Sequence, residues 1–147
     1  DLSILESQDL NIADSYKVLN ITYEYRDFAF ILLNSSLFFF YWIVFSDCYN
    51  LTKKYFQINI PINIDTNKCK ALAEALNYDL FNKMVVAEYT YKNKGTVRFA
   101  QFFPKQSKTI IDKIDQLLAK YYNFTEEELD FIINYDIKYR MGDELNE

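Results

Sequence analysis

The chain of 147 residues contains no histidine, only two glycines and only two prolines. Without histidine, Ser-His-Asp and Cys-His catalysis, histidine-ligated zinc and histidine acid–base chemistry are all excluded. Gly95 and Gly142 lie too far apart for a phosphate-binding P-loop or a GxGxxG dinucleotide fingerprint. The scarcity of glycine and proline also argues against collagen, flexible linkers and architectures made mostly of turns.

The two cysteines, Cys48 and Cys69, do not form a CxxC motif. A chain of this length can bury a core without a disulfide staple, so we predict reduced thiols and a cytoplasmic location. The sequence begins at Asp1, with neither an initiator methionine nor a signal peptide. We therefore expect it to be the C-terminal fragment of a larger enzyme, folded as one domain over residues 1–147.

Apolar and aromatic residues are abundant: 50% of the chain is hydrophobic and 18% is aromatic. Residues 28–45 contain no charge, which reaches the lower length limit of a membrane span, about 18 residues. The polar triplet 34–36 divides this run, and no basic flank marks a cytoplasmic side. We therefore predict a helix, a break capped by Asn34 or Ser35, and a second buried helix, with no membrane partner.

Periodicity predicts the other elements. Residues 16–23 have the β-branched and aromatic content of a strand. Isoleucine occupies every second position of 58–64, which predicts an edge strand or an extended connector around Pro61. A helix should begin after Asp65 or Thr66 and extend to about Tyr89, with apolar residues at helical spacing.

The C-terminal half continues with a turn over 93–95, a strand over 96–103 and a helix over 108–121 capped by Ser107. The sequence from Thr125 to Glu128 has the form of a capping box and should begin a helix ending near Tyr135. The expected fold class is α+β, with a few short strands and about five helices that end in an αα-hairpin.

Charge is distributed unevenly along the chain, whose net charge is −5. Residues 1–52 hold two basic and seven acidic residues, and 126–147 hold two basic and eight acidic residues. Residues 53–108, in contrast, hold ten basic and four acidic residues. A clustered positive surface, whatever the total charge, is what polyanion binding requires. A lysine-rich surface with no such role is the alternative interpretation.

Three groups of residues are chemically suggestive. In the segment 46–54, Tyr49 could stack on a base, Asn50 could form paired hydrogen bonds, and Lys53 and Lys54 could contact phosphate. The alternative is a capped loop in which Asn50 or Thr52 begins a helical turn. Asp112 and Asp115 share a helix face, where we expect solvated carboxylates and not an acid–base pair. Asp136 and Lys138 form the only acid-x-Lys triplet of the kind found in metal-dependent nucleases.

Two stretches resemble a known family. The run SKTIIDKIDQLLAKYYNFTEEELDFIINYDIKYRMG (107–142) is similar to the C-terminal end of bacterial adenine-N6 DNA methyltransferases of restriction-modification systems, in particular the large single-chain enzymes that combine methylase and specificity regions. The run LNSSLFFFYWIVFSDC (33–48) resembles the last helix before the proline-containing strand of their target-recognition region. Together the two stretches cover about a third of the chain, in the family's order.

The resemblance implies a DNA-specificity fragment, with residues 1–65 ending the target-recognition region and 66–147 forming a helical C-terminal part. The family's (Asn/Asp)-Pro-Pro-(Tyr/Phe) motif holds the flipped adenine, but Pro61 and Pro104 are followed here by Ile and Lys. The glycine-bearing S-adenosylmethionine loop is absent as well. We therefore expect no catalytic residue, metal or cofactor in the fragment, although S-adenosylmethionine is implied for the parent.

The expected function is recognition of double-stranded DNA, beside an upstream methyltransferase domain of the same chain. Charge and position give the candidate DNA-binding residues, namely Tyr49, Asn50, Lys53, Lys54, Lys92, Lys94 and Arg98. One alternative is a structural docking module of the same enzyme without DNA contact of its own. Another is a remnant nuclease that uses Asp136 and Lys138 with a divalent metal.

Overall fold

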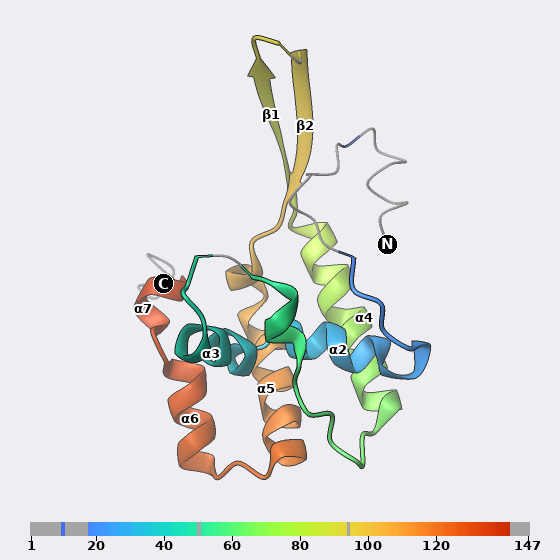
Figure 1. The fold of residues 1–147 in the computed structure, drawn as a ribbon, viewed down its shortest axis with the longest axis vertical. Coiled ribbons are helices and arrows are strands. Elements are labelled where there is room, and N and C mark those ends of the chain that lie inside the picture. The colour runs from blue at the N-terminus through green and yellow to red at the C-terminus, as the bar shows by residue number, and fades with distance from the viewer. Residues whose placement is uncertain (1–9, 11–17, 50, 94, 142–147) are drawn as a thin grey trace.

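A computed structural model describes residues 10, 18–49, 51–93 and 95–141. Helices form the body of the molecule, and one β-hairpin projects from it (Figure 1). The α+β class predicted from the sequence is confirmed. The elements in chain order are η1 (Tyr23–Tyr25), α2 (Arg26–Leu33), α3 (Ser36–Phe45), η2 (Lys53–Phe56), α4 (Thr66–Asn82), β1 (Val85–Tyr91), β2 (Gly95–Gln101), η3 (Pro104–Ser107), α5 (Lys108–Tyr122), α6 (Glu126–Asn134) and α7 (Ile137–Met141), where η denotes a 3-10 helix.

The uncharged run divides into α2 and α3 at the polar triplet, as predicted. The prediction that the second helix is buried is wrong, because only Ser36 and Phe38 of α3 are buried and Phe45 is exposed. Ser35 is the cap: its Oγ accepts a hydrogen bond from Phe38 N at 3.0 Å and donates one to Leu32 O at 2.6 Å. The two helices meet at an angle of 75°. No single helix among the described residues has the length and apolar character to cross a bilayer; only this bent pair, taken together, meets those two criteria.

Helix α4 begins as predicted but ends earlier. Asp65 caps it by accepting a hydrogen bond from Lys68 N at 3.1 Å. The prediction that it continues to Tyr89 is wrong, because the helix ends at Asn82 and β1 occupies 85–91. Residues 85–91 are rich in β-branched and aromatic side chains, and β2 supplies the backbone partners that a strand requires.

Strands β1 and β2 form a two-stranded antiparallel sheet, with Glu88 opposite Arg98 and Tyr91 opposite Gly95. The predicted turn lies between them. Gly95 has a φ of +74°, a left-handed value that glycine adopts without steric penalty. The predicted strand over 96–103 is confirmed in position, although β2 ends at Gln101 and Pro104 begins η3.

Helices α5 and α6 are adjacent and contact each other. Asn123 ends α5 in a left-handed conformation with a φ of 57°. The capping box is confirmed: Thr125 Oγ1 accepts from Glu128 N at 3.2 Å, and Glu128 Oε2 accepts from Thr125 N at 2.8 Å. The short helix α7 follows, so this helix pair is not the last element of the described chain.

Two predicted strands are wrong. Residues 18–22 form no regular element and 23–25 are the 3-10 helix η1, with Val18 and Tyr23 exposed; residues 16 and 17 lie outside the described part of the chain. Residues 58–64 pair with no strand in the described part of the chain and serve as the extended connector that was the alternative. Alternating isoleucines do not make a strand here, because Ile58 and Ile64 pack on the core whereas Ile62 is 99% exposed.

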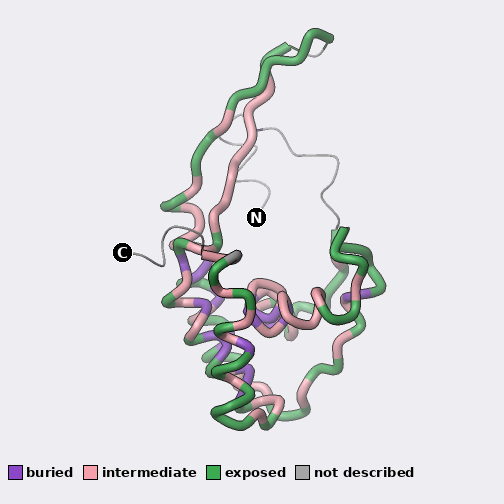
Figure 2. The backbone as a smooth tube through the Cα atoms, turned by 90° about the vertical axis from the view of Figure 1, so that its left-hand side faces the viewer, coloured by how far each residue is buried: buried purple, intermediate pink, exposed green. Residues whose placement is uncertain are grey.

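The core lies where α2, α4 and α5 meet. Ile31, Leu76, Ile114 and Leu118 are completely buried. Buried residues gather in the helical body, whereas exposed and intermediate residues make up the projecting hairpin (Figure 2). The body therefore supplies the stability, and the hairpin is available for contact with a partner.

Candidate nucleic-acid interface

The β1–β2 hairpin, called the ribbon below, is the most prominent surface feature (Figure 1). Residues 83–108, which contain the ribbon and its base, hold six basic residues and one acidic residue. That acid is Glu88, whose Oε1 lies 3.1 Å from Arg98 Nε in a cross-strand ion pair. Lys92 is exposed at the turn, whereas Lys94 lies outside the described residues. The ribbon is thus a basic arm on an acidic chain.

Aromatic and polar side chains also line the ribbon. The rings of Tyr89 and Phe99 lie 6.1 Å apart, and Gln101 Nε2 donates to the hydroxyl of Tyr89 at 3.0 Å. Tyr89 and Tyr91 remain about half exposed. These contacts fix the cross-strand register, and the exposed rings and amide offer both stacking and hydrogen bonding to a ligand.

The second group of candidates lies in the segment 46–54. Tyr49 is 85% exposed, and its backbone N–H donates to Asp47 Oδ1 at 3.2 Å. Lys53 and Lys54 are exposed in η2, and Lys54 Nζ lies 4.6 Å from the centre of the Tyr55 ring. The predicted helical turn after Thr52 is present, but the Thr52 side chain does not cap it. Asn50 lies outside the described residues.

The two groups do not form one continuous site. The ribbon projects away from the helices, whereas η2 lies against the body through the buried Tyr55 and through Phe56, which stacks on Phe38 at 6.1 Å (Figure 1). A pocket of about 690 Å³ adjoins both groups. Leu51 of the segment 46–54 and Phe102 at the base of the ribbon both line it.

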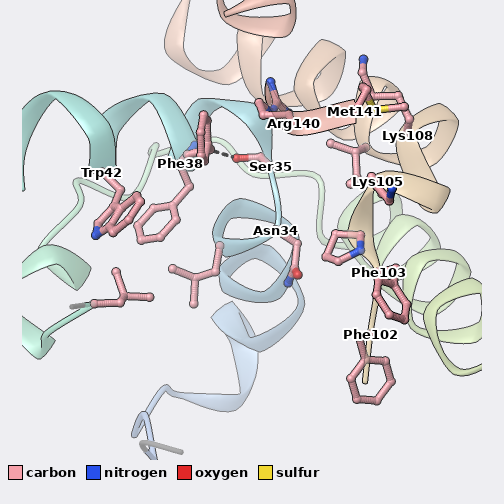
Figure 3. A pocket seen from close by; sticks show the side chains of 15 residues that line it. Asn34, Ser35, Phe38, Trp42, Phe102, Phe103, Lys105, Lys108, Arg140 and Met141 are labelled. Atoms are coloured by element: carbon pink, nitrogen blue, oxygen red, sulfur yellow. Dashed lines mark hydrogen bonds between the residues drawn. The ribbon is translucent and has the colours of Figure 1, made fainter. Parts of the chain in front are cut away.

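Aromatic and basic side chains dominate the lining of this pocket. Five aromatic residues from α3 and the base of the ribbon contribute, namely Phe38, Phe39, Trp42, Phe102 and Phe103. The charged lining residues are Lys105, Lys108 and Arg140, and none is acidic. Trp42 and Phe38 lie on one side and Asn34 lies in the middle, whereas Lys105 and Lys108 lie on the other side together with Phe102 and Phe103 (Figure 3). Arg140 lies against α3, over the ring of Phe39.

A buried carboxylate lies close to this pocket. Asp115 is only 2% exposed, so the expectation of a solvated face formed by Asp112 and Asp115 is wrong for Asp115. Its Oδ1 accepts hydrogen bonds from Ser36 N at 2.9 Å and Leu37 N at 3.4 Å, at the N-terminus of α3. Burial raises the pKa of Asp115, and these hydrogen bonds partly oppose the shift. The carboxylate compensates the positive end of the α3 dipole.

Arg140 completes the network from α7. Its Nη2 donates to Ser36 Oγ at 2.6 Å, its Nη1 donates to the carbonyl of Ile133 at 3.2 Å, and its guanidinium lies 5.0 Å from the centre of the Phe39 ring. Burial lowers the pKa of this group. Sequence analysis did not single out Arg140 or the lining lysines Lys105 and Lys108, since no local motif links them to α3.

Other predicted groups have structural roles. Ser107 does not cap α5, as its hydroxyl donates instead to Asp79 Oδ2 at 2.7 Å and links η3 to α4. Cys69 is 1% exposed and belongs to the core, as predicted, and burial raises the pKa of its thiol.

The nuclease alternative finds no support in the described chain. Asp136 and Lys138 are both exposed, and within residues 18–49, 51–93 and 95–141 no three His, Cys, Asp or Glu side chains gather into a metal-binding group. Within those residues, Asp136 belongs to no cluster of three side chains that could hold the metal of such a nuclease.

Comparison with known proteins gives no match: no family model, curated protein or solved structure is similar to this chain. The resemblance to the methyltransferases therefore stays a prediction. The features of the structure that bear on function are the ribbon, the segment 46–54 and the pocket.

Proposed function

We propose that this chain is a DNA target-recognition part of an adenine-N6 DNA methyltransferase of a restriction-modification system, itself without catalytic or cofactor residues. The observation that supports the proposal best is the ribbon, a projecting arm over 85–101 that holds three basic residues, Lys92, Lys94 and Arg98, against one acidic residue, Glu88. The major groove of B-DNA admits a two-stranded β-ribbon, and lysine and arginine beside it neutralise phosphates.

The proposed division of labour follows from side-chain chemistry. Lys92, together with Lys94 from the same turn, would contact phosphates and fix the position of the ribbon. Gln101 and Tyr89, which hydrogen bond to each other across the ribbon, would present polar groups to base edges. Lys53 and Lys54 would contact a second phosphate segment next to the body. The proposed setting is the cytoplasm, beside an upstream methyltransferase domain that binds S-adenosylmethionine.

Salt dependence of DNA binding tests the proposal. Labelled mixed-sequence duplex DNA is titrated into the chain between roughly 50 and 200 mM salt, a range in which phosphate contacts weaken steeply. We expect affinity to fall across this range and the double variant Lys53→Glu with Lys54→Glu to bind more weakly at every salt concentration. Absence of binding at the low-salt end would contradict the proposal.

A docking module within the same enzyme is the second candidate. It is favoured by large apolar side chains that the described structure leaves in solvent, in particular Phe45 at 66% and Ile62 at 99% exposure. Contiguous apolar surfaces, to which such side chains contribute, mark contact sites for other proteins. If DNA binding is absent and the double variant Phe45→Ser with Ile62→Ser no longer associates with the upstream methyltransferase region, docking becomes the better account.

A further inference from the structure

The pocket described above combines aromatic and basic side chains in its lining. Its volume of about 690 Å³ lies within the range of roughly 300–1,000 Å³ that is usual for small-molecule sites. One side contains the aromatic side chains Phe38 and Trp42 of α3 (Figure 3). Lys105 and Lys108 lie across from them, beside Phe102 and Phe103, and Arg140 lies over the ring of Phe39. No lining residue supplies a negative charge.

Arg140 donates its hydrogen bonds to neutral oxygens, namely the Ser36 hydroxyl and the carbonyls of Ile133 and Tyr135. The carboxylates of Asp115, Asp112 and Asp136 also act on its charge, but none of them lines the pocket. Lys108 pairs with Asp112 across one turn of α5, and the lysine side chain is still 21% exposed. A partly buried guanidinium with neutral partners is stabilised when an anion approaches it.

A polar group lies between the two sides. Asn34 Nδ2 donates to Phe30 O at 2.8 Å, so the amide oxygen Oδ1 remains as the acceptor that faces other partners. In Figure 3 the Asn34 amide lies between the aromatic side and the basic side. A ring that bears N–H donors would therefore find an acceptor next to the surface on which it stacks.

We propose that this pocket binds a planar aromatic ring that carries a negative charge, namely a nucleotide. The base would lie against Phe38 and Trp42, and the phosphate would lie near Lys105, Lys108 and Arg140. Stacking on aromatic side chains holds any base by its π-face, and a phosphate is well matched to a guanidinium. The source is either a free mononucleotide or one nucleotide within a DNA strand, and both present the same chemistry.

The inference stands apart from DNA binding by the ribbon, because it uses no ribbon residue between 85 and 101. Trp42 is the only tryptophan of the chain and lines the pocket, so its fluorescence reports on occupancy. AMP is titrated into the intact chain, and equilibrium dialysis with labelled AMP measures binding independently of the fluorescence signal. Adenosine and inorganic phosphate are titrated separately, because each presents only half of the proposed ligand.

Matched charge variants identify the site. Lys105→Gln with Lys108→Gln removes two lining charges, and Lys113→Gln with Lys120→Gln removes two exposed charges from α5 that do not line this pocket. We expect saturable AMP binding that the first variant weakens on the order of tenfold, since a charge-assisted hydrogen bond contributes about 1.5–3 kcal/mol. The second variant should bind AMP as the original chain does, and neither adenosine nor phosphate should match AMP.

A single-stranded oligonucleotide distinguishes the two sources. If it displaces AMP and changes Trp42 fluorescence, the site takes a nucleotide within a strand; if AMP binds and the oligonucleotide does not compete, the site takes a free mononucleotide. The proposal is overturned if dialysis detects no saturable AMP binding, or if both lysine variants weaken it equally. It is also overturned if an acidic aromatic peptide binds in the pocket and AMP does not, which would assign the surface to a protein partner.

Discussion

The carboxylate of Asp115 on α5 accepts a hydrogen bond at 2.9 Å from the backbone N–H of Ser36, the first residue of α3. Ser36 is fully buried and Asp115 is 2% exposed, so this bond is made away from water. The first N–H groups of a helix have no partner within the helix. A side chain 79 residues away therefore caps α3, in addition to the local cap from Ser35.

Truncation of this side chain should destabilise the fold. In Asp115→Ala the N–H groups of Ser36 and Leu37 lose their acceptor while they remain buried, which costs about 1–3 kcal/mol per unsatisfied group. Urea denaturation followed by circular dichroism measures the free energy of unfolding. The matched control is Gln116→Ala, the exposed neighbour on α5. Equal stability of the two variants would show that the buried bond contributes nothing.

The same carboxylate should make stability depend on pH. Its pKa in the folded chain is raised above the ordinary 3.8, chiefly by burial, so the folded state binds the proton more tightly than the unfolded state does. Its contribution to stability is therefore complete below pH 3.8 and is lost as pH rises through the folded-state pKa. Asp115→Asn does not titrate, and we expect its stability relative to the original chain to increase over that window.

A pH series of urea titrations on both proteins measures this difference. The pKa of Asp79 is shifted in the opposite direction, because hydrogen bonds from Lys83 and, to a lesser extent, Ser107 to its carboxylate lower the pKa below 3.8. Its contribution is lost only as pH falls, and it is present in both proteins, so the comparison removes it. A stability difference that is constant between pH 3.8 and neutrality would contradict the prediction.

Neutralising the turn of the ribbon should reduce the salt dependence of DNA binding. In Lys92→Gln with Lys94→Gln we expect the slope of log affinity against log salt to decrease by about two, since each phosphate contact contributes about one. Fluorescence anisotropy with labelled duplex measures the slope. Lys70→Gln with Lys113→Gln makes the same change in charge on the exposed surfaces of α4 and α5. An equal decrease in both variants would point to overall charge and away from the ribbon.

The two thiols should differ sharply in reactivity. Cys48 is exposed, whereas Cys69 is 1% exposed and burial raises its pKa, which lowers the fraction of reactive thiolate. We expect a chromogenic disulfide reagent to modify one thiol of the native chain rapidly and the second only on unfolding. Cys48→Ser should abolish the rapid phase. A rapid phase that persists in that variant would mean that Cys69 is accessible in the native chain.

Local signals predicted the helices well. The polar triplet that separates α2 from α3 and the capping box of Thr125 and Glu128 act over a few residues, so the sequence alone reveals them. The end of α4 was missed because the preference of 85–91 for a strand depends on pairing with 95–101, a partner outside the local window. The isoleucines of 58–64 show the opposite error, since a strand pattern without a neighbouring strand forms only a connector.

The candidate site was harder to predict than the fold. The sequence predicted Lys92 and Arg98 near a turn between a helix and a strand, whereas the structure places them on a hairpin of two strands and pairs Arg98 with Glu88. The pocket brings together residues from α2, α3, η3 and α7 that are up to about a hundred positions apart, as Ser35 and Arg140 illustrate. On a helical wheel of α5 alone, Asp115 lies on the polar face that would be exposed to solvent. The packing of α3 against this position buries Asp115.

The ribbon has a dynamic consequence. Its two strands hydrogen bond only to each other within the described chain, and an isolated two-stranded hairpin is marginally stable in water. Its amide hydrogens should therefore exchange with deuterium through local fraying, at rates set by a small opening free energy. Amides in α4 and α5 around Leu76 and Leu118 should exchange only when the whole molecule unfolds. Bound DNA would slow exchange in the ribbon first, so the least protected element of the free chain would become the most sensitive reporter of binding.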